Sequence, residues 1–160
     1  MFNQLQPLLV AAAIIREKLD DDLGSTKFDP LRVLIAKRKS DAKMEAGKWE
    51  FPGGKVEVGE HPEECLIREI REELGLEIDV DQFFALNSHI DESRGKLRHI
   101  VLLSYICWHV SGEVQLLDVA DAKWATMDEL SEYEWAEADL PFVEKLQKQG
   151  LPQVGFEHGE

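Results

Sequence analysis

The sequence predicts an α/β protein in which a mixed β-sheet lies between helices. Strand-like apolar segments recur along most of the chain, and two segments carry the proline and glycine signals that begin and end helices. No internal repeat or linker divides the 160 residues, which are enough to bury a real core. We therefore expect one domain, residues 1–160.

The N-terminal part is predicted to contain two strands joined by a polar connection. Residues 8–15 are a continuous apolar run, which suits a buried strand, and residues 32–38 (RVLIAKR) predict a second strand. Residues 16–30 between them are polar and acidic, and we interpret them as a surface loop with no function of its own. Residues 39–48 form another polar loop.

Residues 62–74 are predicted to form the first helix. Pro62 suits the first helical turn, where two glutamates also complement the helix dipole. Gly75 suits the left-handed residue just past the helix end. An apolar face, largely separate from an acidic face, is made by Cys65, Leu66, Ile70 and Leu74. One side of this helix is therefore expected to pack against the sheet.

Strand signals dominate the segment that follows this helix. Residues 77–88 contain strand-like pieces, residues 91–96 (DESRGK) a turn, and residues 98–110 a long strand rich in β-branched and aromatic side chains. A short strand is predicted at residues 123–125 and a helical turn at residues 127–130. These elements would complete the sheet.

The last element is predicted to be a helix over residues 140–149. Pro141 lies in its first turn and Gly150 follows its end. The remaining residues, 151–160, are predicted to be a flexible tail.

The charge balance bears on the partners that the protein can take. With 18 basic and 32 acidic residues, the net charge is −14. Such a charge disfavours binding to long nucleic acids and to anionic membranes, so we expect neither as a partner. It does not exclude a small polyanionic ligand, because metal ions and a few arginines can invert the field inside a cleft.

The two cysteines and the apolar runs bear on the compartment. Cys65 falls in a helix pattern and Cys107 in a strand pattern, which favours core thiols over a disulfide or a metal pair. No apolar run approaches the roughly 20 residues of a membrane span. We therefore expect a cytoplasmic protein, while the sequence indicates nothing about its oligomeric state.

The most informative segment is residues 54–76, which read GKVEVGEHPEECLIREIREELGL. Glu69, Glu72 and Glu73 are spaced i, i+3, i+4, so their side chains share one face of the helix. Three carboxylates on one face repel each other unless a cation lies among them. Hard oxygen ligands at this density suit Mg²⁺, with Mn²⁺ as an alternative, and both ions also bind phosphate oxygens.

This segment resembles the Nudix box, whose pattern is G-x5-E-x7-R-E-U-x-E-E-x-G-U with U aliphatic. Every fixed position is filled, by Gly54, Glu60, Arg68, Glu69, Ile70, Glu72, Glu73, Gly75 and Leu76. The alternative is a solvated amphipathic helix rich in glutamate. That alternative explains neither Arg68 nor the glycines at both ends of the segment.

The resemblance implies a fold and a metal site. The fold is the Nudix α/β/α sandwich, with a mixed central sheet and the Nudix loop and helix. Arg68 and Glu60 are expected to organise the loop rather than to catalyse. The expected metal site comprises the carbonyl of Gly53 and the side chains of Glu57, Glu69, Glu72 and Glu73.

The stretch WEFPGGK, residues 49–55, is similar to the MutT-type branch of the family, the nucleoside triphosphate pyrophosphohydrolases. In that branch an arginine at the end of the second strand contacts the substrate phosphates, and Arg38 matches it. A second arginine opens the strand after the box, and Arg98 matches it. Either side chain could instead be an ordinary surface arginine.

The branch also supplies a further acidic residue, a metal ligand or general base, six positions before a tryptophan. Asp118 has this spacing to Trp124, where the branch more often carries glutamate. Asp121 is a nearby rival.

Base recognition in this branch uses a polar residue two positions before a proline, near the start of the final helix. Asp139 matches this position. An ionised aspartate only accepts hydrogen bonds and so favours an exocyclic amino group such as cytosine N4, whereas a protonated one could donate to an oxopurine. The alternative is that Asp139 only caps the helix. Phe51 and Trp135 are candidates for stacking on the base, or are simply core residues.

The resemblance implies a Mg²⁺-dependent pyrophosphohydrolase that converts nucleoside triphosphate and water to monophosphate and pyrophosphate. Candidate substrates include 5-substituted (d)CTP and 8-oxo-dGTP. A water acidified by the cation would attack phosphorus, and Glu69 or Asp118 would take its proton. The alternatives are a Nudix hydrolase of a sugar nucleotide, dinucleoside polyphosphate or capped RNA, and a non-catalytic nucleotide-binding module.

Overall fold

The structure is a computed structural model that describes residues 6–17, 31–92 and 95–152. It contains a seven-stranded mixed sheet in which five strands follow the order β3-β2-β1-β6-β5. The remaining strands, β4 and β7, pair with β1 and β2 respectively. The strands are β1 (Leu8–Arg16), β2 (Arg32–Lys37), β3 (Trp49–Glu50), β4 (Gly53–Lys55), β5 (Glu77–Asp91), β6 (Arg98–Ser111) and β7 (Asp121–Thr126).

Strand β1 lies at the centre of the sheet and joins its parts. It runs parallel to β6 from the Leu8–Ile100 pair to the Arg16–Trp108 pair. Its other edge pairs antiparallel with β4, where Ala12 is opposite Gly53, and then with β2. The parallel pairing of β1 and β6 brings segments 92 residues apart in the sequence side by side, and the pairing of β4 with β1 brings Gly53 and Gly54 to the sheet.

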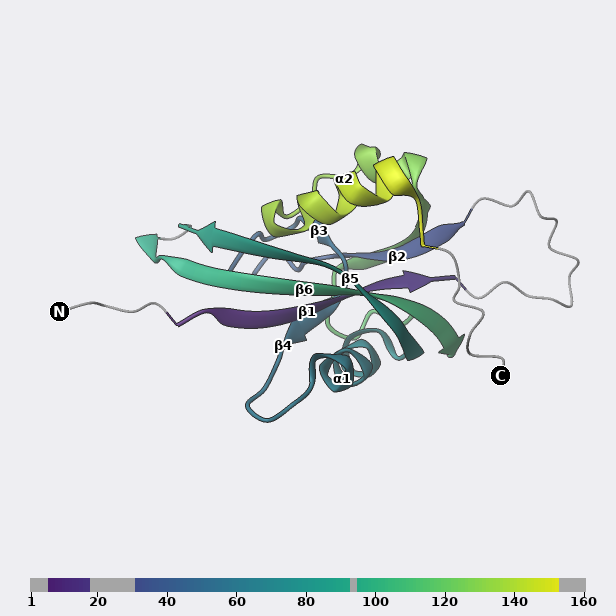
Figure 1. Ribbon diagram of the computed structural model, residues 1–160, viewed down its shortest axis with the longest axis horizontal. Helices are drawn as coiled ribbons and strands as arrows, with labels where there is room; N and C mark the ends of the chain where they lie inside the picture. Colours follow the sequence, from purple (N-terminus) through teal and green to yellow (C-terminus); the bar gives the residue numbers. More distant parts are fainter. Residues whose placement is uncertain (1–5, 18–30, 93–94, 153–160) are drawn as a thin grey trace, which may run out of the picture.

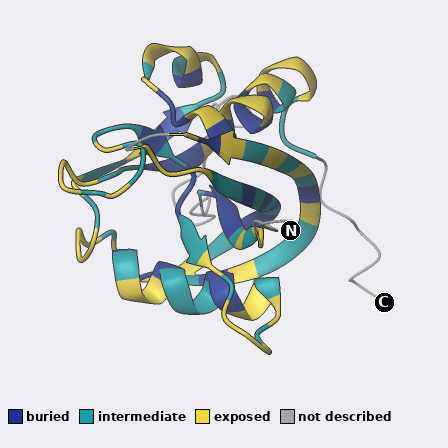
Figure 2. Cartoon of the chain, turned by 90° about the vertical axis from the view of Figure 1, so that its left-hand side faces the viewer, coloured by how far each residue is buried: buried dark blue, intermediate teal, exposed yellow. Residues whose placement is uncertain are grey.

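Two cores, one on each face of the sheet, define the layers. Helix α1 (Pro62–Leu74) covers one face and helix α2 (Leu140–Gln149) the other (Figure 1). Alternate residues of β1 serve the two cores: Ala13 and Ile15 pack in the core with α1, and Ala12 and Ile14 in the core with α2. Both faces of β1 are buried over residues 11–15, which explains why this part of the strand is continuously apolar. Figure 2 shows buried residues on the strands and exposed residues along the outer loops.

Both helices have the bounds that the sequence predicts. Gly75 takes the left-handed conformation, with φ of 68°, and its N–H donates to the carbonyl of Arg71 at the end of α1. The apolar face predicted for α1 is fully buried. Two 3₁₀ helices, η3 (Asp128–Glu132) and η4 (Glu137–Asp139), precede α2, and η3 corresponds to the helical turn expected at residues 127–130.

The strands differ from the prediction at several points. The pieces expected at residues 77–88 form one strand, β5, which extends to Asp91 and contains three register shifts. The short strands β3 and β4 carried no sequence signal of their own, since a pairing of two or three residues leaves no periodicity. Most of the predicted loop 16–30 and tail 151–160 lies outside the described residues. Within the described part of the chain, no helix is long and apolar enough to span a membrane.

Candidate active site

The two glycines of β4 allow the helix and the sheet to approach each other closely. A Cβ on Gly53 would overlap the carbonyl oxygen of Ala11, and a Cβ on Gly54 would overlap the Glu69 carboxylate. Glycine is therefore required at position 53, where the obstacle is the backbone of β1, whereas a side chain at position 54 would have to displace the Glu69 carboxylate. The packing presses the Glu69 carboxylate against the backbone of β4.

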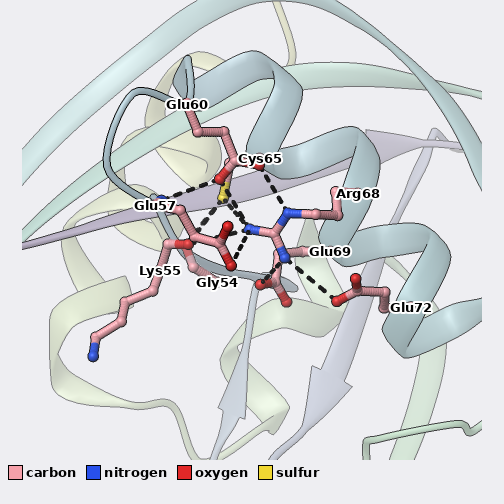
Figure 3. A network of polar contacts seen from close by, with 8 residues as sticks. All are labelled: Gly54, Lys55, Glu57, Glu60, Cys65, Arg68, Glu69 and Glu72. Atoms are coloured by element: carbon pink, nitrogen blue, oxygen red, sulfur yellow. Dashed lines mark hydrogen bonds and ion pairs between the residues drawn. The ribbon is translucent and has the colours of Figure 1, made fainter.

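Arg68 is the centre of a network that joins the loop to helix α1 (Figure 3). Its Nε and Nη2 donate to the two carboxylate oxygens of Glu60 at 2.8 and 2.9 Å. Its Nη1 donates to Glu69 at 2.9 Å and to Glu72 at 3.4 Å. Glu57 lies farther away, at 3.9 Å, with a side chain that is 70% exposed. One guanidinium thus neutralises part of the charge of a carboxylate cluster.

Glu60 is held by the loop as well as by Arg68. Its Oε1 accepts a hydrogen bond from the backbone N–H of Glu57 at 3.1 Å, which closes the turn before α1. The hydrogen bonds from Arg68 and from this backbone N–H lower the pKa of Glu60 to about 2. Glu60 therefore remains ionised and organises the loop, as the sequence predicted.

Glu73 lies on the side of α1 that faces the cleft. Burial, and next the neighbouring carboxylates of Glu50, Glu69 and Asp118, together raise the pKa of Glu73 to about 9. Glu69 and Glu73 lie one helical turn apart, at positions i and i+4, and so share one face of α1. Two carboxyl groups this close are stable together when a proton or a cation lies between them.

The structure separates the two acidic candidates after β6. The loop before β7 caps the end of α1, because the N–H groups of Leu117 and Asp118 both donate to the Glu73 carbonyl, at 3.0 and 3.3 Å. Asp118 thereby lines a cavity of about 340 Å³ together with Glu73 and Arg38, and it pairs with Lys39 at 2.9 Å. Asp121 instead accepts a hydrogen bond from the N–H of Ala122 in β7. The geometry favours Asp118.

A larger cleft of about 650 Å³ lies beside this cavity. Arg38, which follows β2, and Arg98, the first residue of β6, both line it. Among the described residues that line the cleft, the basic ones are Arg38, Lys43, Lys55, Lys96 and Arg98, and the acidic one is Glu73. An acidic protein therefore concentrates positive charge in one cleft.

A smaller pocket of about 110 Å³, mostly apolar, adjoins the cleft at Arg38. Phe51 is almost fully buried, but it lines this pocket together with Asp139. Trp135 does not line it: its ring packs on Phe51 at 4.9 Å and its indole N–H donates to the Leu130 carbonyl. Of the two aromatic candidates, only Phe51 faces the pocket.

The helix-cap alternative for Asp139 is wrong. Asp139 occupies the position before α2 but makes no side-chain capping bond there. Its Oδ2 accepts a hydrogen bond from the N–H of Phe51 at 2.9 Å, 88 residues away in the sequence. Burial, and next the neighbouring Glu50, raise the pKa of Asp139 well above its ordinary value.

Two further features were missed by sequence reasoning. Glu50 lines both smaller cavities and pairs with Arg38, but its position in WEFPGGK carries no separate signal. Glu45, His89 and Asp91 place three possible ligand atoms within 4.8 Å of one another, on the other side of the small pocket. Their separation in sequence hides this cluster, to which we assign no role.

A family model described as the NUDIX domain matches residues 11–146 of the chain. The chain belongs to the Nudix family. The match runs from within β1 to within α2 and includes the box, Asp139 and most of the residues that line the cleft. The family resemblance and the α/β/α sandwich predicted from the sequence are confirmed.

Named Nudix relatives fall in the MutT-like branch. The chain is 37% identical over 116 residues to the CTP pyrophosphohydrolase of Escherichia coli K12, covering 71% of this chain and 80% of that protein. It is 32% identical over 132 residues to the 8-oxo-dGTP diphosphatase of the same organism, covering 82% of this chain and 98% of that protein. The crystal structure of the MutT NUDIX hydrolase from Burkholderia pseudomallei matches with a TM-score of 0.70 and 30% identity, covering 88% of this chain and 98% of that one.

The Nudix residues fit a divalent cation. Their donor atoms are carboxylate and carbonyl oxygens, which suit Mg²⁺ or Mn²⁺ rather than a soft metal. Glu69 and Glu73 lie one helical turn apart on the same face of α1, and the space above Gly54 that a side chain would fill is occupied by the Glu69 carboxylate. Glu72 is 60% exposed on the same helix. The assignment of individual ligands, including Gly53 and Glu57, stays a prediction.

Proposed function

We propose that the protein is a divalent-metal-dependent nucleoside triphosphate pyrophosphohydrolase. The main support for this proposal is the 650 Å³ cleft, which is lined by Arg38 and Arg98 together with Glu73 of the Nudix helix. The basic side chains bind the phosphate chain, and the carboxylates would hold a divalent cation beside it. The basic side chains and the cation together offset the repulsion that a protein with a net charge of −14 would otherwise exert on a polyphosphate in the cleft.

The roles of the side chains follow from their positions. Arg38 and Arg98 orient the phosphates, while Glu69, Glu72 and Glu73 hold the cation. When bound, Mg²⁺ or Mn²⁺ would supply Lewis acidity at the phosphate oxygens and lower the pKa of a water molecule. Glu69 or Asp118 accepts the proton from the attacking water. Arg68, itself held by Glu60, keeps the Glu69 carboxylate in position through hydrogen bonds.

The base is proposed to enter the small pocket between Phe51 and Asp139. The relatives named above act on CTP and on 8-oxo-dGTP, and both classes of base are candidates for this chain. An ionised Asp139 accepts from the amino group of cytosine, and a protonated Asp139 donates to an oxopurine. Because burial raises the pKa of Asp139, the protonation state of this one group decides between the two substrates.

We also propose that the protein is cytoplasmic and consists of a single domain. Cys65 and Cys107 are both buried and free, as the sequence predicted, which suits the reducing cytoplasm. The family match over residues 11–146 fits one domain that occupies residues 1–160.

The test is a panel of nucleoside triphosphates hydrolysed in ¹⁸O-labelled water. Release of monophosphate and pyrophosphate, with no label in orthophosphate from the γ position, is the expected result. Diphosphate and labelled orthophosphate would contradict the mechanism. The panel should contain a sugar nucleotide and a dinucleoside polyphosphate, because exclusive turnover of either would replace the proposed substrate class. Binding of all substrates with no turnover of any would indicate a binding module.

A further inference from the structure

Arg38 occupies a junction between the binding spaces. It lines the small pocket, the 340 Å³ cavity beside Asp118 and the 650 Å³ cleft. The residue follows the last residue of β2. Its backbone N–H donates to the Lys48 carbonyl and its carbonyl accepts from the Gly47 N–H, which closes the loop that leads to β3. A guanidinium in this position can touch a ligand from several sides, so its orientation needs to be set by the protein.

The hydrogen bonds of Arg38 leave one end of the guanidinium available. Nε donates to the carbonyl of Met44 at 2.8 Å, and Nη1 donates to the two carboxylate oxygens of Glu50 at 2.7 and 3.2 Å. A guanidinium has five N–H donors, two of which are on Nη2. Within the described residues, Nη2 has no hydrogen-bond partner, so its two donors remain for a ligand.

Glu50 is rigidly placed for this contact. It belongs to β3 and lies opposite Ala36, two residues before Arg38, in the antiparallel pairing with β2. Its side chain is 20% exposed and that of Arg38 is 29% exposed, so the pair is shielded from water more than a surface ion pair. The charge-assisted bond restrains a long side chain that would otherwise sample many rotamers.

We propose that Glu50 is a positioning residue, which holds Arg38 between the base pocket and the phosphate cleft so that Nη2 meets the phosphate chain. Glu50 acts through Arg38 and does not itself bind metal or phosphate. Because Glu50 also lines the base pocket, it links the position of the phosphate-binding Arg38 to the pocket that receives the base. The inference rests on the proposed function for its ligand, a polyphosphate, but not on turnover.

The alternative is that the Arg38–Glu50 pair only stabilises the junction of β2 and β3. The two explanations predict different behaviour in a double-mutant cycle of Arg38→Met and Glu50→Gln. The probe is inorganic tripolyphosphate with Mg²⁺, measured by titration calorimetry, because it has phosphates but no base. Thermal melting of each variant runs alongside.

Glu50→Gln keeps the size of the side chain but loses the charge, and we expect it to weaken tripolyphosphate binding about tenfold, within the roughly 2- to 150-fold range of couplings between contacting residues. In the Arg38→Met background the same change is expected to have almost no further effect on binding. With nucleoside triphosphates, Glu50→Gln should raise KM more than it lowers kcat. Glu134→Gln is the matched control, since it removes an exposed carboxylate paired with Lys48 and should leave binding unchanged.

Additive losses in the cycle, or normal binding by Glu50→Gln, would overturn the proposal. If Glu50→Gln does not fold, Glu50→Asp provides the same test, because it keeps the charge but withdraws the carboxylate by one methylene group. Tripolyphosphate binding decides this question even if no nucleoside triphosphate is hydrolysed, so failure of the proposed function is distinguishable from failure of the inference.

Discussion

Arg68 and Glu60 form a two-pronged contact that joins the Nudix loop to its helix. Nε and Nη2 of the guanidinium donate to the two oxygens of one carboxylate, at 2.8 and 2.9 Å. The third nitrogen, Nη1, reaches Glu69 and Glu72 on the helix. Arg68 therefore connects the loop to two of the proposed metal ligands, Glu69 and Glu72.

Replacing Arg68 by lysine should impair metal binding without removing the positive charge. Lysine is a point charge and cannot donate in the forked geometry to Glu60 while also reaching Glu69. We expect metal affinity and activity to fall roughly 10- to 100-fold, as for other outer-shell partners. Mn²⁺ titration followed by electron paramagnetic resonance measures this loss. An unchanged Mn²⁺ affinity would show that the charge alone is sufficient.

Glu73→Gln should reduce activity by more than the roughly 10- to 100-fold typical of an outer-shell residue. The change removes one anionic ligand and keeps the volume of the side chain, so the loss reflects metal binding rather than packing. The comparison is kcat/KM at saturating and limiting Mg²⁺. Glu63→Gln, on the exposed first turn of the same helix, is the matched control. Wild-type activity in Glu73→Gln, or full turnover by the wild type in excess chelator, would refute the metal assignment.

Asp139→Asn should change the preference for the base. Asparagine both donates and accepts at every pH, whereas the aspartate donates only while protonated. We expect the kcat/KM ratio for cytosine nucleotides over 8-oxo-dGTP to rise with pH in the wild type and to be flat in the variant. The amplitude should correspond to about 1–3 kcal/mol, the value of a good hydrogen bond to a base edge. A ratio independent of pH in both proteins would exclude Asp139 from base recognition.

Stability in acid should depend on Glu60. Its pKa is lowered to about 2 in the folded protein, below the ordinary value of 4.5, so the folded state favours the ionised form. This stabilisation is fully present above about pH 4.5 and is lost as the pH falls towards 2. Thermal melting from pH 2 to pH 6 should therefore show the wild type losing its advantage over Glu60→Gln in this window. Parallel melting curves of the two proteins across the window would contradict the assignment.

Much of the fold follows from local patterns. Each of the helices α1 and α2 has a proline in its first turn and a glycine just after its last residue. Both helices have the bounds that the sequence predicts, because helix capping depends only on residues within the first and last turns. The same local patterns could not locate β3 and β4, or show that β5 is one bulged strand. Those features depend on pairing with partners elsewhere in the chain.

The sequence by itself determined the Nudix box, since the carboxylates, Arg68 and the glycines lie within one loop and one helix whose geometry is local. Only the tertiary structure decided that Asp118 rather than Asp121 lines the cavity with Glu73, and that Asp139 bonds to Phe51 instead of capping α2. These contacts join segments far apart in the chain. Their distances are set by sheet pairing and core packing, which no pattern of neighbouring residues records.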